Sequence, residues 1–344
     1  MKRKLRVAII SPPFGQTGGP ELSTIQLADA LVDKGIDVTL FAPADFKTKA
    51  NLIPTLEKSF WKMKDLDKMS LLEKRNLIIS SQVKILALQE NFDIIHISSQ
   101  RYGYAVAKNL QKPSLITMHN RMKKRDYALL KKTDTATVAL TKKYKNHIRA
   151  TAYIYPGISV KDIRPSFLKG EGLITVGRIT DQKGIHLAIE IAKEAKKKLT
   201  IVGRIGYSEE RQKYFKKNIQ PYLKKDSIEL IEEISNKNLL KLIAKSEALL
   251  FPIIRPETFG RVSIEALACG TPVIGTKTDP LPEILHNKKV SLLSDDITEL
   301  VEAAKNTDRF NRNECRKYAE KYFDSSRMAD EYIKLYNKIL ARKK

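Results

Sequence analysis

The chain has little cysteine, few aromatic residues and no long apolar run. Its 344 residues include 2 cysteines and 1 tryptophan, and aromatic residues make up 7% of the total. The two cysteines, Cys269 and Cys315, form neither a metal-binding spacing nor a disulfide framework, which favours a reducing compartment. No stretch approaches the roughly 20 apolar residues of a membrane-spanning helix. The apolar run behind the basic start ends at Pro12 and is too short for a signal peptide, so we expect a cytoplasmic protein.

Length and composition predict a globular protein of two domains. Hydrophobic residues make up 42% of the chain and charged residues 30%, which is the balance of a globular protein rather than a disordered or fibrous one. A chain of 344 residues is longer than one hydrophobic core usually supports, so two domains are expected.

The net charge of +24 predicts an anionic partner, which leaves nucleic acid, phosphorylated ligands and an acidic membrane surface as candidates. The basic residues are densest between residues 121 and 149: Arg121, Lys123, Lys124, Arg125, Lys131, Lys132, Lys142, Lys143, Lys145 and Arg149. Solvated helix faces are the first interpretation, and a membrane-facing patch is the alternative. Nucleic acid is not expected, because aromatic residues do not alternate with these lysines as base stacking would require.

Short apolar runs alternate with segments of helical period, which is the pattern of parallel sheets covered by helices on both faces. The predicted class is α/β, with one doubly wound unit in each half. In the first half the expected strands are 6–10, 38–41, 94–97, 115–118, 135–140 and 152–155. In the second half they are 173–176, 199–202, 228–231, 248–251, 273–274 and 291–293.

The domain boundary is expected where Pro156, Gly157 and Pro165 interrupt the chain and the alternation of strands and helices begins again. The first domain would comprise residues 1–157 and the second residues 158–325. A helical apolar stripe follows the second sheet. We expect this C-terminal helix, residues 326–344, to pack back on the first domain.

Chemistry is expected in the loops directly after strands, because ligands of open α/β sheets gather at the carboxyl ends of the strands. The first loop contains Gly15, Gly18 and Gly19, and Glu21 begins a helix whose free amides suit an anion. A dinucleotide site is disfavoured, since the spacing is not G-x-G-x-x-G and the second strand has no acidic residue at its tip. We interpret this loop as facing a phosphate.

The second loop, in VGRITDQKGIHLAIE, places Arg178 and Lys183 five residues apart, between a strand and the N-terminus of a helix. Such a pair can hold a diphosphate from two sides. Solvated surface cations are the alternative interpretation of these two residues.

The third loop, in RPETFGRVSIEALACGTPVIG, places Glu257 before a helix expected over residues 260–268 and Glu265 inside it. The helical rise of about 1.5 Å per residue puts the carboxylates on the order of 10 Å apart, which suits two parts of one elongated ligand. The amides near Phe259, Gly260 and Arg261 would face a phosphate between them. A glycosidase acid and base pair is the rival interpretation, disfavoured because the basic loops indicate a phosphorylated ligand.

These segments resemble the retaining family 4 glycosyltransferases of the GT-B fold. PETFGRVSIEALACGTPVIG is similar to the E-x7-E signature of that family, and VGRITDQKGIHLAIE is similar to its diphosphate segment. In the first half, TGGPELSTIQLADALVDKGIDVTLF, FDIIHI, LITMHN and YPGI match in order. The resemblance implies two Rossmann-like domains facing each other across a cleft, an acceptor site in the first and a nucleotide-sugar site in the second.

The resemblance also implies residue roles. Arg178 and Lys183 would stabilise the leaving diphosphate, Glu257 would contact the donor sugar, and His119 would lie by the anomeric carbon. The expected donor-binding residues are Gly18, Gly19, Ile234, Thr258, Phe259, Gly260, Arg261 and Glu265, with Glu265 on the ribose. Without the family, His119 is more simply a satisfied polar residue at a strand end. No metal ion and no cofactor is expected.

The preferred function is retaining transfer of a hexose from a nucleoside diphosphate sugar, with a UDP-sugar favoured over a GDP-sugar. The expected acceptor is a glycan or a lipid headgroup, and the inner membrane face is a further expected partner. The alternative is a non-catalytic anion-binding protein of the same fold. Glu232 stands where the family usually has a glycine, which leaves the base contact at Ile234 and the nucleotide open.

Residues 47–89 match nothing specific in the family. Within them, SFWKMKDLDKMSLLEKR carries Phe60, Trp61, Met63, Leu66 and Met69 among lysines. The favoured prediction is ordinary helical core packing. An acceptor lid and a membrane-contact helix are the alternatives.

Overall fold

The computed structural model describes residues 3–16, 18–64, 66, 68–98, 100–122, 133, 135–223 and 227–342. The chain forms two compact units, unit 1 (Met1–Ser159 with Ser325–Lys344) and unit 2 (Val160–Asp324). Among the described residues, no helix has both the length and the apolar character needed to cross a bilayer.

Unit 1 is built on a parallel sheet in the order β3-β2-β1-β4-β5-β6-β7. Its strands are β1 (Arg6–Ile10), β2 (Asp37–Ala42), β3 (Asn51–Pro54), β4 (Ile94–Ile97), β5 (Ser114–Thr117), β6 (Ala136–Ala139) and β7 (Ala152–Tyr153). The six strands predicted for this half are confirmed. The sequence pattern does not predict β3, because this short edge strand ends in proline and has no buried residue.

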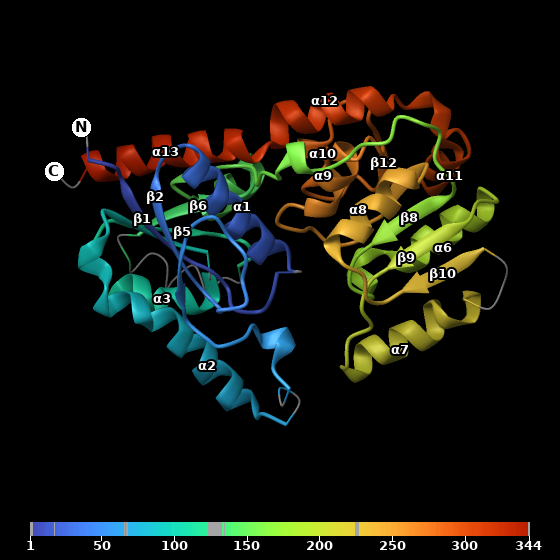
Figure 1. Ribbon diagram of the computed structural model, residues 1–344. Helices are drawn as coiled ribbons and strands as arrows, with labels where there is room; N and C mark the ends of the chain where they lie inside the picture. Colours follow the sequence, from blue (N-terminus) through green and yellow to red (C-terminus); the bar gives the residue numbers. More distant parts are fainter. Residues whose placement is uncertain are drawn as a thin grey trace. The chain divides into compact units, whose positions relative to one another are not determined.

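Helices cover both faces of this sheet (Figure 1). They are α1 (Gly19–Asp33), α2 (Leu71–Val83), α3 (Gln100–Lys108), α5 (Lys142–Ile148) and α13 (Ser325–Ala341), with the 3-10 turns η1 (Phe60–Lys62), η2 (Lys84–Ala87) and η3 (Gln89–Asn91). On one face, Leu31 of α1 and Tyr336 of α13 join a core cluster with Leu40 of β2. On the other, Val106 of α3 and Ile148 of α5 join a second cluster.

The C-terminal helix α13 therefore belongs to unit 1, although all of unit 2 lies before it in the sequence. Its apolar stripe lies in the same core cluster as α1 and the sheet and consists of Met328, Tyr332, Leu335, Tyr336 and Ile339. A helix that buries one such stripe is held by hydrophobic burial rather than by its own propensity.

The segment before α2 departs from the prediction of ordinary core packing. Phe60 is buried, but Trp61 is 54% exposed, and Met63, Leu66 and Met69 are only partly buried. The prediction is therefore right for Phe60 and wrong for Trp61. Alternation of apolar and charged residues indicates an amphipathic element but does not tell which side faces the core.

The basic stretch between residues 121 and 149 is described only in part. Residues 123–132 and 134 lie outside the described residues, and so do five of the predicted basic residues. In α5, Tyr144 and Ile148 are buried, while Lys142 and Lys143 are exposed. This part of the stretch presents an exposed basic helix face, which both the solvated-face and the membrane-facing interpretations predict.

Unit 2 is built on a second parallel sheet in the order β10-β9-β8-β11-β12-β13. Its strands are β8 (Leu173–Val176), β9 (Leu199–Val202), β10 (Ile228–Ile231), β11 (Ala248–Phe251), β12 (Val273–Gly275) and β13 (Ser291–Leu293). All six are predicted from buried apolar runs and are confirmed, with β12 one residue longer than expected.

The helices of unit 2 lie on both faces of its sheet (Figure 1). They are α6 (Ile185–Glu194), α7 (Glu209–Asn218), α8 (Asn236–Lys245), α9 (Arg261–Ala268), α10 (Leu281–Ile284), α11 (Ile297–Lys305) and α12 (Arg312–Phe323), with η4 (Val160–Asp162), η5 (Asp181–Lys183), η6 (Gln220–Tyr222) and η7 (Thr307–Arg309). Helices α6 and α11 share one core cluster, and α9 packs against α8 and α12.

Candidate functional site

The strand order of unit 2 reverses between β8 and β11, which are neighbours in the sheet. The loop after β8 carries Arg178 and Lys183, and the loop after β11 carries Glu257. Ligands of open α/β sheets bind at such a reversal, where two loops diverge from adjacent strand ends. The fold thus brings together residues that lie more than 70 positions apart in the sequence.

Lys183 and Glu257 form an ion pair in which the Lys183 ammonium contacts Oε1 of Glu257. Their side chains are 15% and 22% exposed, so both are mostly shielded from solvent while remaining accessible. The Lys183 ammonium also lies 5.3 Å from the centroid of the Phe251 ring, a favourable cation–π position. The sequence predicts both residues as site residues but not their pairing, which only the tertiary structure provides.

Glycine is required where the two loops meet. Gly184 has φ +63°, and a Cβ on it would lie 1.9 Å from the carbonyl oxygen of Pro252. The absence of a side chain lets the turn before α6 approach the loop after β11. Two further contacts tie the loops together: Ile254 N donates to Gln182 O at 2.9 Å, and Arg255 pairs with Asp181 at 3.0 Å. Lys183 is held by this close approach.

Helix α9 begins beside this pair. Gly260 has φ +77° and is the N-cap residue, and no side chain caps the start of the helix. Arg261 Nε donates to Glu265 Oε1 at 2.8 Å, and both side chains are nearly buried. The Phe259 ring packs edge-on against Phe323 at 5.9 Å, so this residue can offer only its main chain to a ligand.

The other donor-site predictions in unit 2 fall in less enclosed places. Arg178 is exposed directly after β8, and Thr258 is half-buried between Glu257 and helix α9. Ile234 is half-buried and follows β10, the edge strand, which is two strands away from β8. Ile234 is therefore the predicted residue least integrated with the Lys183–Glu257 pair.

In unit 1, Gly18 and Gly19 start α1, with Gly18 as its N-cap residue. Directly behind them lies Glu21, which is only 3% exposed. Its carboxylate folds back toward the loop, since a Cβ built on Gly18 would lie 2.0 Å from Oε2 of Glu21. Burial raises the pKa of Glu21 to about 7, against the lowering effect of the backbone N–H groups of Glu21 and Phe14. The sequence places Glu21 at the helix start but gives no sign of its burial.

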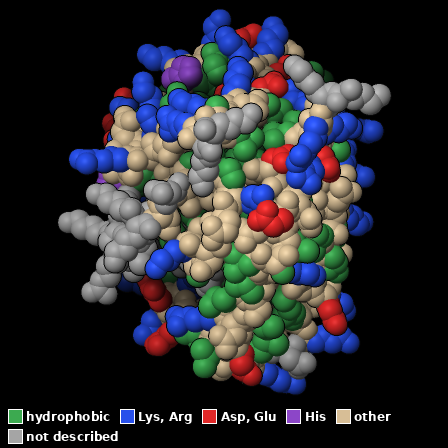
Figure 2. Space-filling model, turned by 90° about the vertical axis from the view of Figure 1, so that its left-hand side faces the viewer, with side chains coloured by type: hydrophobic (Ala, Val, Ile, Leu, Met, Phe, Trp, Pro, Cys, Tyr) green, Lys and Arg blue, Asp and Glu red, His purple; other side chains and the backbone are tan. Residues whose placement is uncertain are grey.

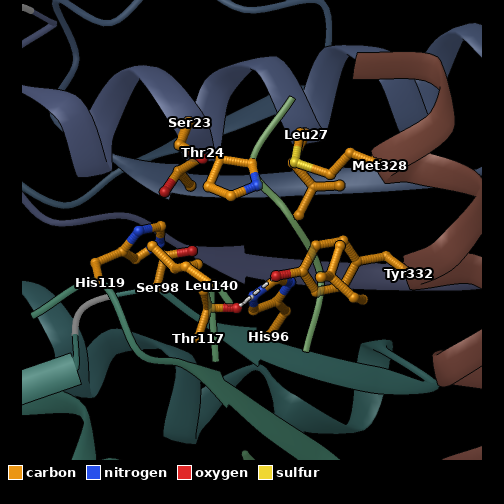
Figure 3. Close-up of a pocket in the computed structure, with 12 residues that line it drawn as sticks. Ser23, Thr24, Leu27, His96, Ser98, Thr117, His119, Leu140, Met328 and Tyr332 are labelled. Carbon is orange, nitrogen blue, oxygen red and sulfur yellow. Dashed lines mark hydrogen bonds between the residues drawn. The ribbon is translucent and has the colours of Figure 1, made fainter. Parts of the chain in front are cut away.

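His119 follows β5 and is 9% exposed. It lines a pocket formed by residues of α1, β4, β5 and α13 together with neighbouring loops: Ser23, Thr24, Leu27, His96, Ser98, Thr117, His119, Leu140, Ile154, Pro156, Met328 and Tyr332. Figure 3 shows His119 at one end of this pocket and Tyr332 at the other. The pocket thus reaches from the end of β5 to the C-terminal helix.

A buried chain of hydrogen bonds joins the inner end of the pocket to α13 (Figure 3). His96 of β4 bonds Tyr336 Oη through Nδ1 at 2.8 Å and Thr117 Oγ1 through Nε2 at 2.7 Å, and Thr117 Oγ1 bonds Tyr332 Oη at 2.8 Å. Burial, with a smaller contribution from His119, lowers the pKa of His96 to about 3. A neutral imidazole suits two hydroxyl partners, because it has one donor and one acceptor nitrogen.

Replacing Tyr336 with Phe should destabilise unit 1 by roughly 1–3 kcal/mol, since His96 Nδ1 would be left buried without its partner. Denaturant unfolding of Tyr336→Phe measures this cost. Tyr153→Phe is the matched control, because the Tyr153 side chain is 39% exposed on β7 and a lost hydroxyl there is replaced by water. Equal unfolding free energies for the two variants would contradict the structural role given to this hydrogen-bond chain.

The two halves of the chain match the models of two known protein families. Residues 17–163 match the family described as Glycosyltransferase Family 4, and residues 161–322 match the family described as Glycosyl transferases group 1. Among curated relatives, the O-antigen chain mannosyltransferase RfbU of Salmonella typhimurium is 27% identical over 178 residues, which are 51% of this chain and 49% of that protein. The chain spans about half the length of this relative.

Two solved structures share the fold over nearly the whole chain. The sucrose-phosphate synthase of Thermosynechococcus elongatus has a TM-score of 0.79 at 18% identity, covering 98% of this chain and 100% of that structure. The Anabaena protein HepE, solved in complex with UDP and glucose, has a TM-score of 0.74 at 17% identity, covering 97% of this chain and 100% of that structure. At these identities the likeness shows the fold alone.

Proposed function

Because the chain belongs to the family 4-like glycosyltransferases of the GT-B fold, we propose that it transfers a hexose from a nucleoside diphosphate sugar to an acceptor hydroxyl. In this proposal unit 2 binds the donor and unit 1 binds the acceptor, a glycan or a lipid headgroup. The observation that carries it is the shielded Lys183–Glu257 pair at the strand-order reversal of unit 2.

The geometry of unit 2 supports one orientation of the donor. Lys183 has three N–H donors, so it can keep Glu257 as a partner and still bind a phosphate oxygen. Arg178 would bind the diphosphate from the same strand end, and the N-terminus of α9 beside Gly260 would face the phosphates. Glu257 would then contact the sugar, while Glu265, held by Arg261 inside the helix, would contact the ribose.

Breaking the bond between the anomeric carbon and the phosphate oxygen leaves negative charge on the diphosphate and positive charge on the sugar. Cations and helix amides at the position of the developing diphosphate charge lower the barrier for this step. We propose that the acceptor oxygen attacks on the same face as the departing diphosphate, which takes up the acceptor proton and gives retention. His119, at the end of β5, is proposed to lie by the anomeric carbon.

A uridine nucleotide is proposed as the donor base, ahead of guanosine. Its support is the likeness in fold to a protein solved with UDP and glucose. Calorimetric titration of the protein with UDP and with GDP tests this choice directly. Tighter binding of GDP than of UDP would reject it without affecting the proposed reaction.

Replacing Glu257 and replacing Glu265 with Gln are expected to have different effects on the reaction. Glu257→Gln should keep affinity for the free nucleoside diphosphate and lower transfer, because it loses a contact with the reacting sugar. Glu265→Gln should weaken binding of the free nucleotide by roughly 1–3 kcal/mol, the value of a hydrogen bond to a charged group. Titration of each variant with UDP, beside an assay of sugar transfer, separates the two effects.

The reverse result would show that the donor lies the other way round. In that case Glu257→Gln would lose nucleotide affinity and Glu265→Gln would retain it. Glu283→Gln is a suitable control, since Glu283 is a partly buried glutamate of α10 to which the proposal gives no ligand.

A further inference from the structure

Helix α2 turns apolar side chains to solvent. Leu71 and Leu72 at its start are 64% and 66% exposed, and Ile79 and Val83 are 42% and 39% exposed. Leu72, Ile79 and Val83 recur at intervals of seven and four residues, so they lie along one face of the helix. The buried residues of α2 are Ile78, Ser81 and Gln82, two of which are polar. The helix thus buries Ile78 on one side and presents a second apolar stripe to solvent, whereas an ordinary surface helix keeps its apolar residues on the buried face.

The same segment contains the exposed Trp61, so residues 60–84 hold five of the ten large hydrophobic side chains that are exposed in the described residues. Figure 2 shows hydrophobic side chains gathered over the lower part of the face it presents, with Lys and Arg side chains around them. Single exposed apolar residues need no explanation, but a concentration of them marks an interaction surface.

The surface is also basic. Residues 60–84 include six Lys or Arg and three Asp or Glu, within a chain of net charge +24. Lys62, Lys64, Lys68 and Arg75 are exposed in this segment. The centres of protein–protein interfaces are depleted in lysine, whereas helices that lie in a bilayer interface combine Leu and Trp on one side with Lys and Arg on the other.

Trp61 and α2 are both attached to the rest of unit 1 by hydrogen bonds. A capping box between Ser70 and Glu73 fixes the start of α2. Trp61 N donates to Phe14 O at 3.0 Å, and Gln82 Nε2 donates to Ser11 O at 3.4 Å. Both contacts are made to the loop after β1, which also carries Gly18.

We propose that Trp61 and the exposed face of α2 form a docking surface for an anionic lipid bilayer and insert among its headgroups. The occupant is a lipid surface because the patch joins aliphatic side chains and a tryptophan to a surplus of lysine. The proposal does not depend on the proposed sugar transfer, since binding to lipid is measured without donor or acceptor.

The test is co-sedimentation with vesicles of phosphatidylcholine alone and of equal parts phosphatidylcholine and phosphatidylglycerol. The full chain should co-sediment with the anionic vesicles and not with the neutral ones. Added salt should release it, because screening weakens the attraction between its lysines and the anionic headgroups. The sequence contains a single tryptophan, Trp61, so tryptophan fluorescence reports on this surface alone. Its emission should shift to shorter wavelength when the protein binds the anionic vesicles.

The triple variant Leu72→Ser, Ile79→Ser and Val83→Ser should lose about tenfold or more of this binding, since all three apolar contacts with the bilayer are removed. The matched control is Phe167→Ser with Leu168→Ser, which removes side chains 50% and 79% exposed on unit 2 and should bind like the unaltered chain. The proposal is overturned by failure to sediment with anionic vesicles at low salt, by an unshifted Trp61 emission in their presence, or by equal binding of the triple variant. Should the triple variant not fold, the Trp61 emission of the unaltered chain still decides between the outcomes.

Discussion

Replacing Lys183 with Ala should lower sugar transfer by roughly 10²-fold or more, and Arg178→Ala should have an effect of the same order. Each variant loses a charge-assisted contact that strengthens as the diphosphate departs. The Lys183 side chain is held beside Glu257 by the close approach at Gly184, so its ammonium needs little reorganisation during the reaction. Steady-state assays of transfer and of donor hydrolysis would measure the loss.

Arg178→Ala should leave folding nearly unchanged, because Arg178 is exposed, whereas Lys183→Ala should lower stability, because it leaves the shielded carboxylate of Glu257 without its ammonium partner. The rates of transfer are therefore compared at a temperature at which both variants are folded. Lys216→Ala is the control, since Lys216 is an exposed lysine of α7 to which the proposal gives no role. Turnover at the level of the control in both Arg178→Ala and Lys183→Ala would remove these residues from the reaction. A lowered melting temperature in Arg178→Ala would instead point to a structural role for that residue.

Replacing Glu21 with Gln should remove a pH-dependent penalty on the stability of unit 1. The pKa of Glu21 in the folded protein is about 7, against an ordinary value of 4.5, because the carboxyl is buried. A raised carboxyl pKa means that the protonated form is the stable one in the fold. The stability this form provides is complete below pH 4.5 and is lost as the pH rises through about 7.

At pH 8 the unaltered chain therefore carries a penalty of about 3 kcal/mol that Glu21→Gln avoids, and at pH 4 the two should differ little. Urea unfolding of both proteins across this range gives the difference in free energy directly, which cancels the titration of other groups. Glu73→Gln is a control of opposite sign. Hydrogen bonding to Ser70 lowers the pKa of Glu73, so the stability that its carboxylate contributes is present above the ordinary pKa of 4.5 and is lost as the pH falls through the lower folded value. Above pH 4.5, Glu73→Gln should therefore differ from the unaltered chain by a constant amount. Parallel stability curves for Glu21→Gln and the unaltered chain would contradict the burial of an ionisable carboxyl behind Gly18.

Much of the fold is predictable because it depends on local patterns. Buried parallel strands such as β4 and β11 are nearly continuous apolar runs, which fix their identity without knowledge of their neighbours. The start of α9 is predictable because Gly260 takes a conformation that glycine favours. By contrast, β3 is a partly exposed edge strand, and its four residues have no run of buried side chains to reveal it.

The candidate site is predictable as a set of residues but not as a set of contacts. Motif spacing identifies Lys183 and Glu257, yet their pairing depends on which strands become neighbours in the sheet. The bonds from His96 to Thr117 and Tyr336 span 21 and 240 positions, and no periodicity links residues so far apart. The exposure of Trp61 is not predictable for another reason, since an apolar face that meets solvent has the same sequence pattern as one that meets the core.

The position of α13 has a consequence for how the protein is made. Because α13 completes unit 1 but follows unit 2 in the sequence, the ribosome delivers Tyr332 and Tyr336 only after all of unit 2 has been synthesised. Domains generally fold as units, with the N-terminal one first during synthesis. Until α13 is synthesised, one face of the unit 1 sheet is incompletely covered and His96 lacks its Tyr336 partner. Unit 2, which is continuous in sequence, is thus the first part of this chain able to reach its finished structure.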